Sequence, residues 1–267
     1  MIFGSRTNRI QGDYGMTGTG EYILVIPAYN ESATIREVVQ GALEYFGTVI
    51  VVDDGSSDGM VEKLSNMPVT LLQHPENMGK AASLWSGMQA ALNLGAKGVV
   101  TMDGDGQHDP ADIPKLLMAA QAHPNRLVIG SRLWNREVIP TARYRANRFA
   151  NFWIAWASGQ AIEDSQSGFR VYPAQLIRLC SFNPSRNRSF VFESEIIIEA
   201  ARLGFLCTFV PVHTAYPENA RPSYFRPVKD IVSITRMVAW RLFSRGFFLS
   251  GLWRSLSGIQ RLEPRKL

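Results

Sequence analysis

The sequence predicts an α/β fold, in which a mostly parallel sheet carries helices on both faces. Three observations predict it: short segments that are apolar throughout, helical periodicity between them, and polar clusters that directly follow several of the apolar segments. Strands that are apolar on both faces are typical of parallel sheets lying between layers of helices. The chain has 267 residues, 46% of them hydrophobic and 19% charged, which is enough for a sizeable core.

The first half of the chain alternates between the two kinds of element. Apolar side chains between Ile35 and Phe46 recur at the 3.6-residue period of an amphipathic helix. Thr34 and Glu37 have the spacing of a capping box at the start of this helix. The expected strands are residues 22–26, 49–52, 69–72, 98–102 and 127–130, and the expected helices are residues 35–46, 79–94 and 113–121.

The second half of the chain is less regular. Helical patterns cover residues 141–159 and 193–203, and a strand is expected at residues 207–212. Residues 228 to about 256 are expected to form one long apolar helix that contains several arginines.

Charge is distributed unevenly along the chain. From Arg221 to the end there are ten basic residues and two acidic ones, whereas the remainder is slightly acidic. A basic segment on such a body indicates a polyanionic surface as partner. The first twenty residues lack the apolar stretch of a signal peptide and are rich in Gly, Ser and Thr. We therefore expect a flexible tail at residues 1–20, a folded domain at residues 21–227, and a basic amphipathic helix and tail at residues 228–267.

The cysteines and the hydropathy pattern indicate in which cellular compartment the protein is expected. Cys180 and Cys207 form no CxxC pair, so neither a zinc site nor a disulfide framework is indicated, and we expect a reducing, cytoplasmic setting. Because no run of about 18 apolar residues occurs, we expect no transmembrane helix.

Polar clusters follow three of the expected strands. PAYNE (27–31) follows the first strand, DDGSSD (53–58) the second, and DGDGQ (103–107) the fourth. In open parallel sheets, ligands bind beyond the carboxyl ends of the strands. The three clusters are therefore expected to converge on one crevice.

The third cluster places Asp103 and Asp105 on either side of Gly104. Mg²⁺ and Mn²⁺ prefer oxygen ligands, typically one or two protein carboxylates together with substrate phosphates. A calcium-binding EF-hand would need Gly and Glu where His108 and Pro114 stand, so that loop is excluded. Gly104 would let a phosphate or sugar approach the backbone closely. We interpret the cluster as a divalent-cation site, with a solvated turn as the alternative.

Other motifs carry less information. NMGK (77–80) resembles a phosphate loop only superficially, because a Walker A motif needs Gly where His74 stands. No GxGxxG follows the first strand, so a dinucleotide-dependent dehydrogenase is not indicated. The four histidines lack metal-ligand spacing; His74, His123 and His213 are expected at the surface, and His108 is left open.

The ordered set of motifs resembles the family 2 glycosyltransferases of the GT-A fold, and within them the dolichol-phosphate mannose synthase or polyprenyl-phosphate glycosyltransferase group. The resemblance covers residues 22–230 and rests on VIPAYNE, VVDDGSSD, NMGKAASLWSG, MDGDGQHDP, IGSR and DSQSGFR. It implies a GT-A domain at residues 21–227 and transfer of a hexose from a GDP-mannose or UDP-glucose type of donor.

The resemblance also implies roles on the donor side. Asp103 and Asp105 match the motif for metal and diphosphate, with Gln107 as a further metal contact, and the group usually has Ala where this chain has Gly104. The positions matching those around the nucleoside are Pro27, Tyr29, Glu31, Val52 and Asp54.

On the acceptor side, Arg132, Arg143 and Arg221 match basic residues around the sugar phosphate and acceptor phosphate, the last two with divergent flanks. Residues 164–170 match the acceptor loop. Together with Asp105 and Asp164, these arginines are the expected catalytic residues.

The chemistry leaves the acceptor open. A divalent metal and arginines stabilise the charge that develops on the leaving nucleoside diphosphate, and attack on the opposite face inverts the anomeric centre. A phosphate acceptor needs no base, whereas a hydroxyl of a glycolipid or polysaccharide needs a carboxylate. Asp164 is the candidate base, with Glu193 and Glu195 behind it. A remote alternative is a silent nucleotide-sugar-binding protein.

The C-terminal segment fits an interfacial helix, with its apolar side in lipid and its arginines on anionic headgroups. The alternative is a helix that packs on the domain. We expect a protein bound peripherally to the inner face of a membrane through this helix or through a membrane-protein partner. The expected ligands are a nucleotide sugar, a polyprenyl phosphate or other lipid acceptor, and Mg²⁺ or Mn²⁺; no nucleic acid is expected.

Overall fold

The computed structural model describes residues 21–134, 139, 141–182, 191–214, 227–244 and 246–257. Seven strands of this part of the chain form one sheet with the order β3-β2-β1-β4-β6-β5-β7. Neighbouring strands are parallel except for β6, which runs antiparallel to both β4 and β5. The prediction of a mostly parallel sheet is thus confirmed. The strands are β1 (Tyr22–Ala28), β2 (Val49–Asp53), β3 (Thr70–Gln73), β4 (Gly98–Thr101), β5 (Arg126–Ser131), β6 (Arg170–Pro173) and β7 (Leu206–Pro211).

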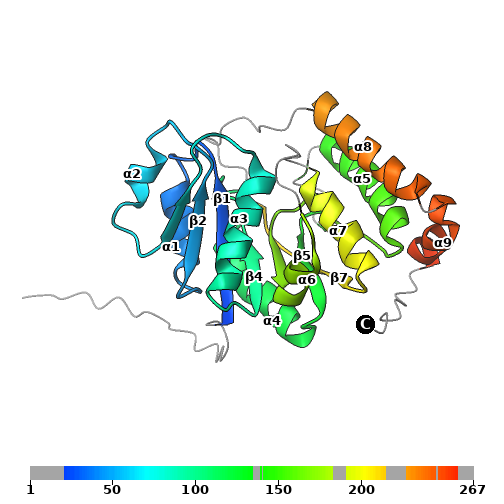
Figure 1. Cartoon of the computed structure of the whole chain (residues 1–267), viewed down its shortest axis with the longest axis horizontal. Helices are drawn as coiled ribbons and strands as arrows, with labels where there is room; N and C mark the ends of the chain where they lie inside the picture. The colour runs from blue at the N-terminus through cyan, green and yellow to red at the C-terminus, as the bar shows by residue number, and fades with distance from the viewer. Residues whose placement is uncertain are drawn as a thin grey trace, which may run out of the picture.

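Helices cover both faces of the sheet, and α5, α8 and α9 gather at one end of the molecule (Figure 1). One hydrophobic core contains side chains of α3, α5, α6, α7 and α8, and a second contains side chains of α1, α2 and α4. Burying the apolar strands between these layers is the main favourable contribution to folding. The α-helices are α1 (Ile35–Ala42), α2 (Met60–Leu64), α3 (Lys80–Asn93), α4 (Ile113–Ala122), α5 (Thr141–Ser158), α6 (Ala174–Leu179), α7 (Phe192–Arg202), α8 (Pro227–Phe243) and α9 (Leu249–Ser257).

Two parts of the second half differ from the expectation. The segment 170–179 forms β6 and α6, which the sequence did not predict because each is too short to show a period. The single helix expected from residue 228 to about 256 is wrong, since α8 and α9 are separated. The residues between the two helices, Gly246, Phe247 and Phe248, all have positive φ angles. This conformation ends a helix, and glycine adopts it easily.

The C-terminal helices pack on the domain and also present apolar side chains outward. Trp156 of α5 donates its Nε1 hydrogen to the carbonyl oxygen of Phe247 at 2.9 Å, which fixes the turn between α8 and α9. No helix of the described segments is both long and apolar enough to cross a bilayer. The residues of α8 in the core are Ile234, Met237, Val238 and Leu242, and the exposed large apolar residues of α8 and α9 are Val232, Trp240, Phe243, Leu249, Trp253 and Leu256.

Candidate functional site

The carboxyl ends of β1 and β4 are joined at the start of α1. The Thr34 hydroxyl donates to the carbonyl oxygen of Gly104 at 2.7 Å. The expected capping box is wrong, because Thr34 makes no side-chain cap to α1 and uses its hydroxyl for this longer-range bond instead. A Cβ on Gly104 would lie 3.2 Å from Ile35 Cδ1 and 3.6 Å from Glu31 Cγ. The missing side chain therefore lets this turn pack closely against α1.

The loops after β1 and β2 are also tied together. The Asn30 backbone N–H donates to Ser56 Oγ at 2.9 Å, and the Ser57 backbone N–H donates to Asn30 Oδ1 at 2.8 Å. Asn30 adopts a positive φ of 53°, which Asn tolerates better than most residues. The three polar clusters thus lie next to one another, as predicted.

Asp54 organises the loop that leads into α3. Its carboxylate accepts hydrogen bonds from the backbone N–H groups of Met78 and Gly79, at 3.0 and 2.8 Å. His74 Nδ1 lies 2.7 Å from the same carboxylate, and its Nε2 lies 3.1 Å from Ser86 Oγ. The expectation that His74 is a surface residue is wrong, because its side chain is largely buried in this contact.

Lys80, the first residue of α3, lies between two carboxylates. Its ammonium is 2.7 Å from Asp103 Oδ1 and 2.9 Å from Glu193 Oε1. Burial alone would lower the pKa of Lys80, but the two carboxylates raise it well above its ordinary value. Burial alone would raise the pKa of Asp103, but the Lys80 ammonium lowers it overall. Lys80 and Asp103 are therefore both charged at neutral pH.

Asp105 and Gln107 lie beside this cluster and are partly exposed. The Gln107 backbone N–H donates to Asp105 Oδ1 at 3.0 Å, which fixes the turn that carries both side chains. Among the described residues, no group of three or more His, Cys, Asp or Glu side chains is placed to hold a metal alone. A cation here would need the Gln107 amide oxygen and substrate phosphates beside the carboxylates.

Arg132 and Asp164 form a bidentate ion pair at the end of β5. Arg132 Nε donates to Asp164 Oδ2 at 2.8 Å and Arg132 Nη2 donates to Oδ1 at 3.1 Å. The backbone N–H groups of Arg132 and Gln166 add two more bonds, each of 3.1 Å. Burial alone would raise the pKa of Asp164, which is 0% exposed, but Arg132 lowers it overall. All four acceptor positions of this carboxylate are filled.

His108 is buried beneath the acidic turn. Its ring packs on Phe169 with the centroids 5.1 Å apart, and its Nε2 is 3.9 Å from Asp103 Oδ2. Burial lowers the pKa of His108 to about 4, so the ring is neutral at physiological pH.

The other predicted site residues are placed less directly. Pro27 and Val52 are buried, and the Val52 side chain packs in the hydrophobic core. Glu31 is buried beside Gly104, and Tyr29 is partly exposed. Arg143 lies in the first turn of α5, but its side chain is outside the description, and Arg221 lies outside the described residues.

Sequence reasoning missed two members of the cluster. Lys80 was set aside with the failed phosphate-loop pattern, although a lysine beginning a helix next to a strand-end carboxylate could have indicated it. Gly168 has no such signal. A Cβ at Gly168 would lie 2.7 Å from Asp103 Oδ2 and 3.0 Å from Asp103 Cγ, so only glycine leaves room for this carboxylate.

Gly168→Ala is expected to reduce turnover at least about tenfold, because the added methyl group displaces the Asp103 carboxylate. Overpacking of this kind costs about 1–3 kcal/mol of folding free energy, so the variant should remain folded. Initial rates and thermal unfolding would be measured together. The matched control is Gly47→Ala, where an added Cβ meets nothing within 4 Å. Wild-type turnover in Gly168→Ala would show that the position of Asp103 does not matter.

Comparison with known proteins agrees with this geometry. The family described as glycosyl transferase family 2 matches residues 23–182, well over half of the chain. The chain belongs to glycosyl transferase family 2. It is therefore an enzyme that transfers sugars, as the resemblance of its motifs implied.

Two curated relatives of this family 2 enzyme are named for lipid-phosphate substrates. The UDP-N-acetylglucosamine–dolichyl-phosphate N-acetylglucosaminyltransferase of Methanococcus voltae is 30% identical, over 73% of this chain and 86% of the relative. The undecaprenyl-phosphate mannosyltransferase of Micrococcus luteus is 27% identical, over 84% of this chain and 95% of the relative.

Among solved structures, glucosyl-3-phosphoglycerate synthase from Mycobacterium tuberculosis has a similar fold. Its complex with Mn²⁺, UDP and glucosyl-3-phosphoglycerate matches with a TM-score of 0.58 and 22% identity, over 85% of this chain and 80% of that one. The same synthase with Mg²⁺ and UDP matches with a TM-score of 0.60. This likeness confirms the GT-A type of fold for the family 2 enzyme.

Proposed function

We propose that this family 2 enzyme transfers a hexose from a nucleotide sugar to a polyprenyl phosphate, with inversion and with a divalent cation. The observation that carries the choice of acceptor is the state of Asp164. Its four acceptor positions are filled by Arg132 and Gln166, so it has no vacant lone pair for the proton of an acceptor hydroxyl. An acceptor that is already anionic needs no such base. The names of the two curated relatives support the same choice.

The residues of the acidic turn fit a divalent cation. Asp103, Asp105 and Gln107 are partly exposed, lie within five positions of one turn and offer only oxygen ligands. Mg²⁺ and Mn²⁺ prefer such ligands and commonly complete their coordination with substrate phosphates. When bound, the cation would neutralise charge on the departing diphosphate. The likeness in fold to a synthase crystallised with Mn²⁺ or Mg²⁺ and UDP supports the proposal.

The residues of the chain would then act as follows. The turn at residues 103–107 holds the diphosphate end of the donor, and the loops after β1 and β2 hold the nucleoside. Asp164 orients the Arg132 guanidinium, which faces the anionic groups of donor and acceptor. A phosphate oxygen of the acceptor attacks the anomeric carbon as the bond from that carbon to the nucleoside diphosphate breaks on the opposite face. No proton has to be removed from an ionised phosphate.

The experiment is a donor screen. GDP-mannose, UDP-glucose and UDP-N-acetylglucosamine would be supplied with a short polyprenyl phosphate and Mn²⁺, and the organic phase would be analysed by mass spectrometry. We expect one donor to give a polyprenyl phosphosugar that is lost on addition of EDTA. Cation-dependent hydrolysis of a donor without any lipid product would keep the transferase and overturn the acceptor.

We also propose that the enzyme binds peripherally to a membrane through α8 and α9. The exposed apolar residues are eight and three positions apart along α8, and four and three positions apart along α9. At 3.6 residues per turn each set falls on one side of its helix, so each helix presents an apolar stripe in addition to the face it buries. Arg236 is exposed on the same side of α8 as Trp240, one helical turn away. Such a surface fits anionic headgroups and the acyl boundary below them. A lipid acceptor would be reached from this surface.

Flotation with vesicles containing phosphatidylserine tests this surface. The wild type should float at low salt and float less at high salt, because part of the attraction is electrostatic. The double variant Trp240→Ser, Trp253→Ser should reduce the bound fraction at least about tenfold, since both side chains are more than 60% exposed and would enter the interface. The melting temperature of this double variant should equal that of the wild type.

The matched control removes exposed apolar side chains elsewhere. Leu94 and Met118 lie outside α8 and α9 and are 60% and 63% exposed. The double variant Leu94→Ser, Met118→Ser should float like the wild type. An equal loss of vesicle binding in both double variants would show that any exposed apolar side chain contributes nonspecifically. Unchanged binding in the tryptophan variant would remove α8 and α9 as the binding surface.

A further inference from the structure

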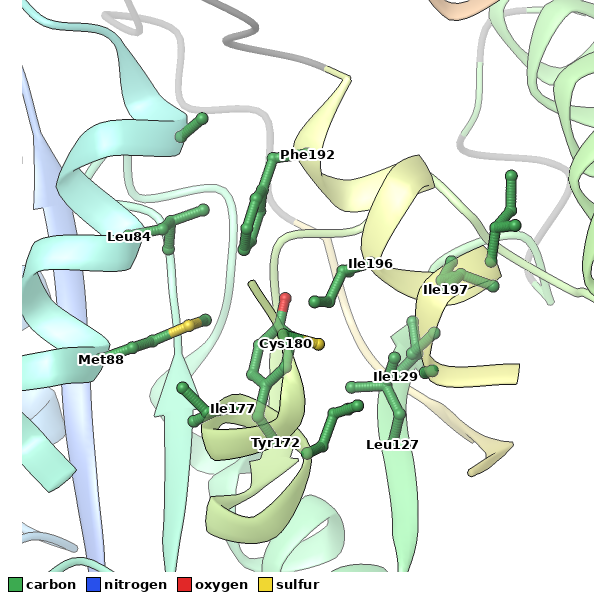
Figure 2. Packing of buried hydrophobic residues seen from close by; sticks show 14 of the residues in the cluster. Leu84, Met88, Leu127, Ile129, Tyr172, Ile177, Cys180, Phe192, Ile196 and Ile197 are labelled. Atoms are coloured by element: carbon green, nitrogen blue, oxygen red, sulfur yellow. The ribbon is translucent and has the colours of Figure 1, made fainter. Parts of the chain in front are cut away.

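Ion pairs of Lys80 with Asp103 and Glu193 connect three separate parts of the enzyme. Lys80 begins α3, Asp103 follows β4, and Glu193 is the second residue of α7. Figure 2 shows that α3 and α7 face one another across the core, with Leu84 directed toward Phe192. The starts of the two helices therefore meet at the acidic turn, where the donor diphosphate is expected.

The start of α7 is itself held in place by Arg170 of β6. The buried Arg170 guanidinium donates to the carbonyl oxygen of Glu193 at 2.8 Å and to that of Ser165 at 2.9 Å. Glu193 is only 3% exposed, and the Phe192 side chain before it is fully buried. These contacts hold the backbone at Glu193, and the Lys80 side chain reaches the Glu193 carboxylate from α3.

A buried carboxylate is stable only when a partner offsets the loss of its hydration. Here one ammonium serves two carboxylates at similar distances, 2.7 and 2.9 Å. Two carboxylates thus share one ammonium, and Asp105 lies on the same turn as Asp103. A divalent cation is attracted to this set of carboxylates. The attraction is greatest when the Lys80 ammonium is shared with Glu193 and does not pair with Asp103 alone.

We propose that Glu193 is a positioning residue for the donor site, which holds Lys80 Nζ between α7 and Asp103 and so keeps the Asp103 carboxylate available to the cation. The inference rests on the proposed function, because it concerns the same cation and diphosphate. With a neutral side chain at position 193, the attraction of the ammonium shifts toward Asp103. The ammonium then competes with the cation, and the local charge becomes less negative by one unit.

The experiment measures cation binding directly, by electron paramagnetic resonance of free Mn²⁺ in a titration of the full chain with UDP present. Glu193→Gln should raise the apparent Kd for Mn²⁺ about tenfold. The matched control is Glu195→Gln on the same helix, where the carboxylate contacts Arg241 at 3.1 Å instead of Lys80. This control should stay within about twofold of the wild type.

A double-mutant cycle separates positioning from a general loss of charge. Lys80→Met removes the competing ammonium and should lower the apparent Kd for Mn²⁺. In that background Glu193→Gln should have no further effect, because Glu193 acts through Lys80. Initial rates with varied donor would show the same pattern as a rise in KM for the nucleotide sugar.

Three outcomes would contradict the inference: an unchanged Kd in Glu193→Gln, the same tenfold effect in the Lys80→Met background, or weaker Mn²⁺ binding in Lys80→Met alone. The last comparison decides the matter if Glu193→Gln does not fold. A wild-type enzyme that binds no Mn²⁺ in the presence of UDP would instead overturn the proposed cation site itself.

Discussion

Asp105→Asn is expected to lower turnover at least about 100-fold while leaving the fold intact. Asn has the same shape and keeps an oxygen that can accept the 3.0 Å bond from the Gln107 backbone N–H. It lacks the negative charge that a divalent cation needs, and a bound cation contributes several kcal/mol of transition-state stabilisation. Initial rates of sugar transfer at saturating Mn²⁺ would measure the loss, and circular dichroism would confirm the fold.

Asp109→Asn is the control for this substitution. Asp109 lies four residues further along the same turn, is exposed, and accepts a hydrogen bond from the Ala111 backbone N–H at 2.9 Å. Asn caps a helix start about as well as Asp, so this variant should keep nearly full activity. Unchanged turnover in Asp105→Asn would remove the cation assignment from this turn.

Asp164→Asn is expected to lower both stability and turnover. Breaking a buried ion pair by neutralising one partner costs about 3–5 kcal/mol, because the remaining charge stays desolvated. The melting temperature should therefore fall by roughly 6–20 °C for a domain of this size. Turnover should fall as well, since Arg132 loses the partner that orients its guanidinium. Glu163→Gln, at the exposed neighbouring position, should change neither quantity.

The pH dependence of stability gives a second test of the pair. Arg132 holds the pKa of Asp164 below its ordinary value of about 4 in the folded enzyme. The pair therefore stabilises the fold fully above the unfolded pKa, and its contribution is lost as the pH falls through the lower folded pKa. The difference in unfolding free energy between wild type and Asp164→Asn should shrink below about pH 4. A difference that stays constant down to pH 2 would contradict the assignment of the charge.

The pH profile of activity in Asp164→Asn distinguishes a hydroxyl acceptor, which needs Asp164 as a base, from a phosphate acceptor, which does not. If Asp164 were a general base, the activity of the wild type would fall with a single ionisation near its pKa, and the variant would lose that step. If it orients Arg132, the variant loses activity across the whole pH range. The filled acceptor positions of Asp164 predict the second pattern.

Much of the fold could be predicted because the strands are apolar throughout. The segments at residues 22–26 and 49–52 lie within β1 and β2, where every residue except Tyr22 is buried. β6 and α6 could not be predicted, because the pairing of Arg170–Pro173 with β4 and β5 is a long-range property that leaves no local period. The break between α8 and α9 lies at Gly246, Phe247 and Phe248, and the two phenylalanines gave no sign of it within an otherwise helical pattern.

The candidate site was predictable where polar residues directly follow strands. Asp103 and Asp105 belong to that class, and the structure joins their turn to the start of α1 and to α3. Gly168 and Glu193 could not be found in this way, since their roles come from contacts with Asp103 and Lys80 across 65 or more positions of the chain. The hydrogen-bond partners of Asp164 could not be predicted from the sequence either, so its role as a general base stayed open.

The choice between an anionic acceptor and a hydroxyl acceptor is tested most directly by offering both. The purified enzyme would be given the same nucleotide sugar and Mn²⁺ with either a polyprenyl phosphate or the corresponding polyprenol, and the lipid products would be quantified. We predict a glycosylated product from the phosphate and none from the alcohol. Transfer to the polyprenol at an equal or greater rate would contradict the account, because the enzyme would then need a base that the Arg132–Asp164 pair does not provide.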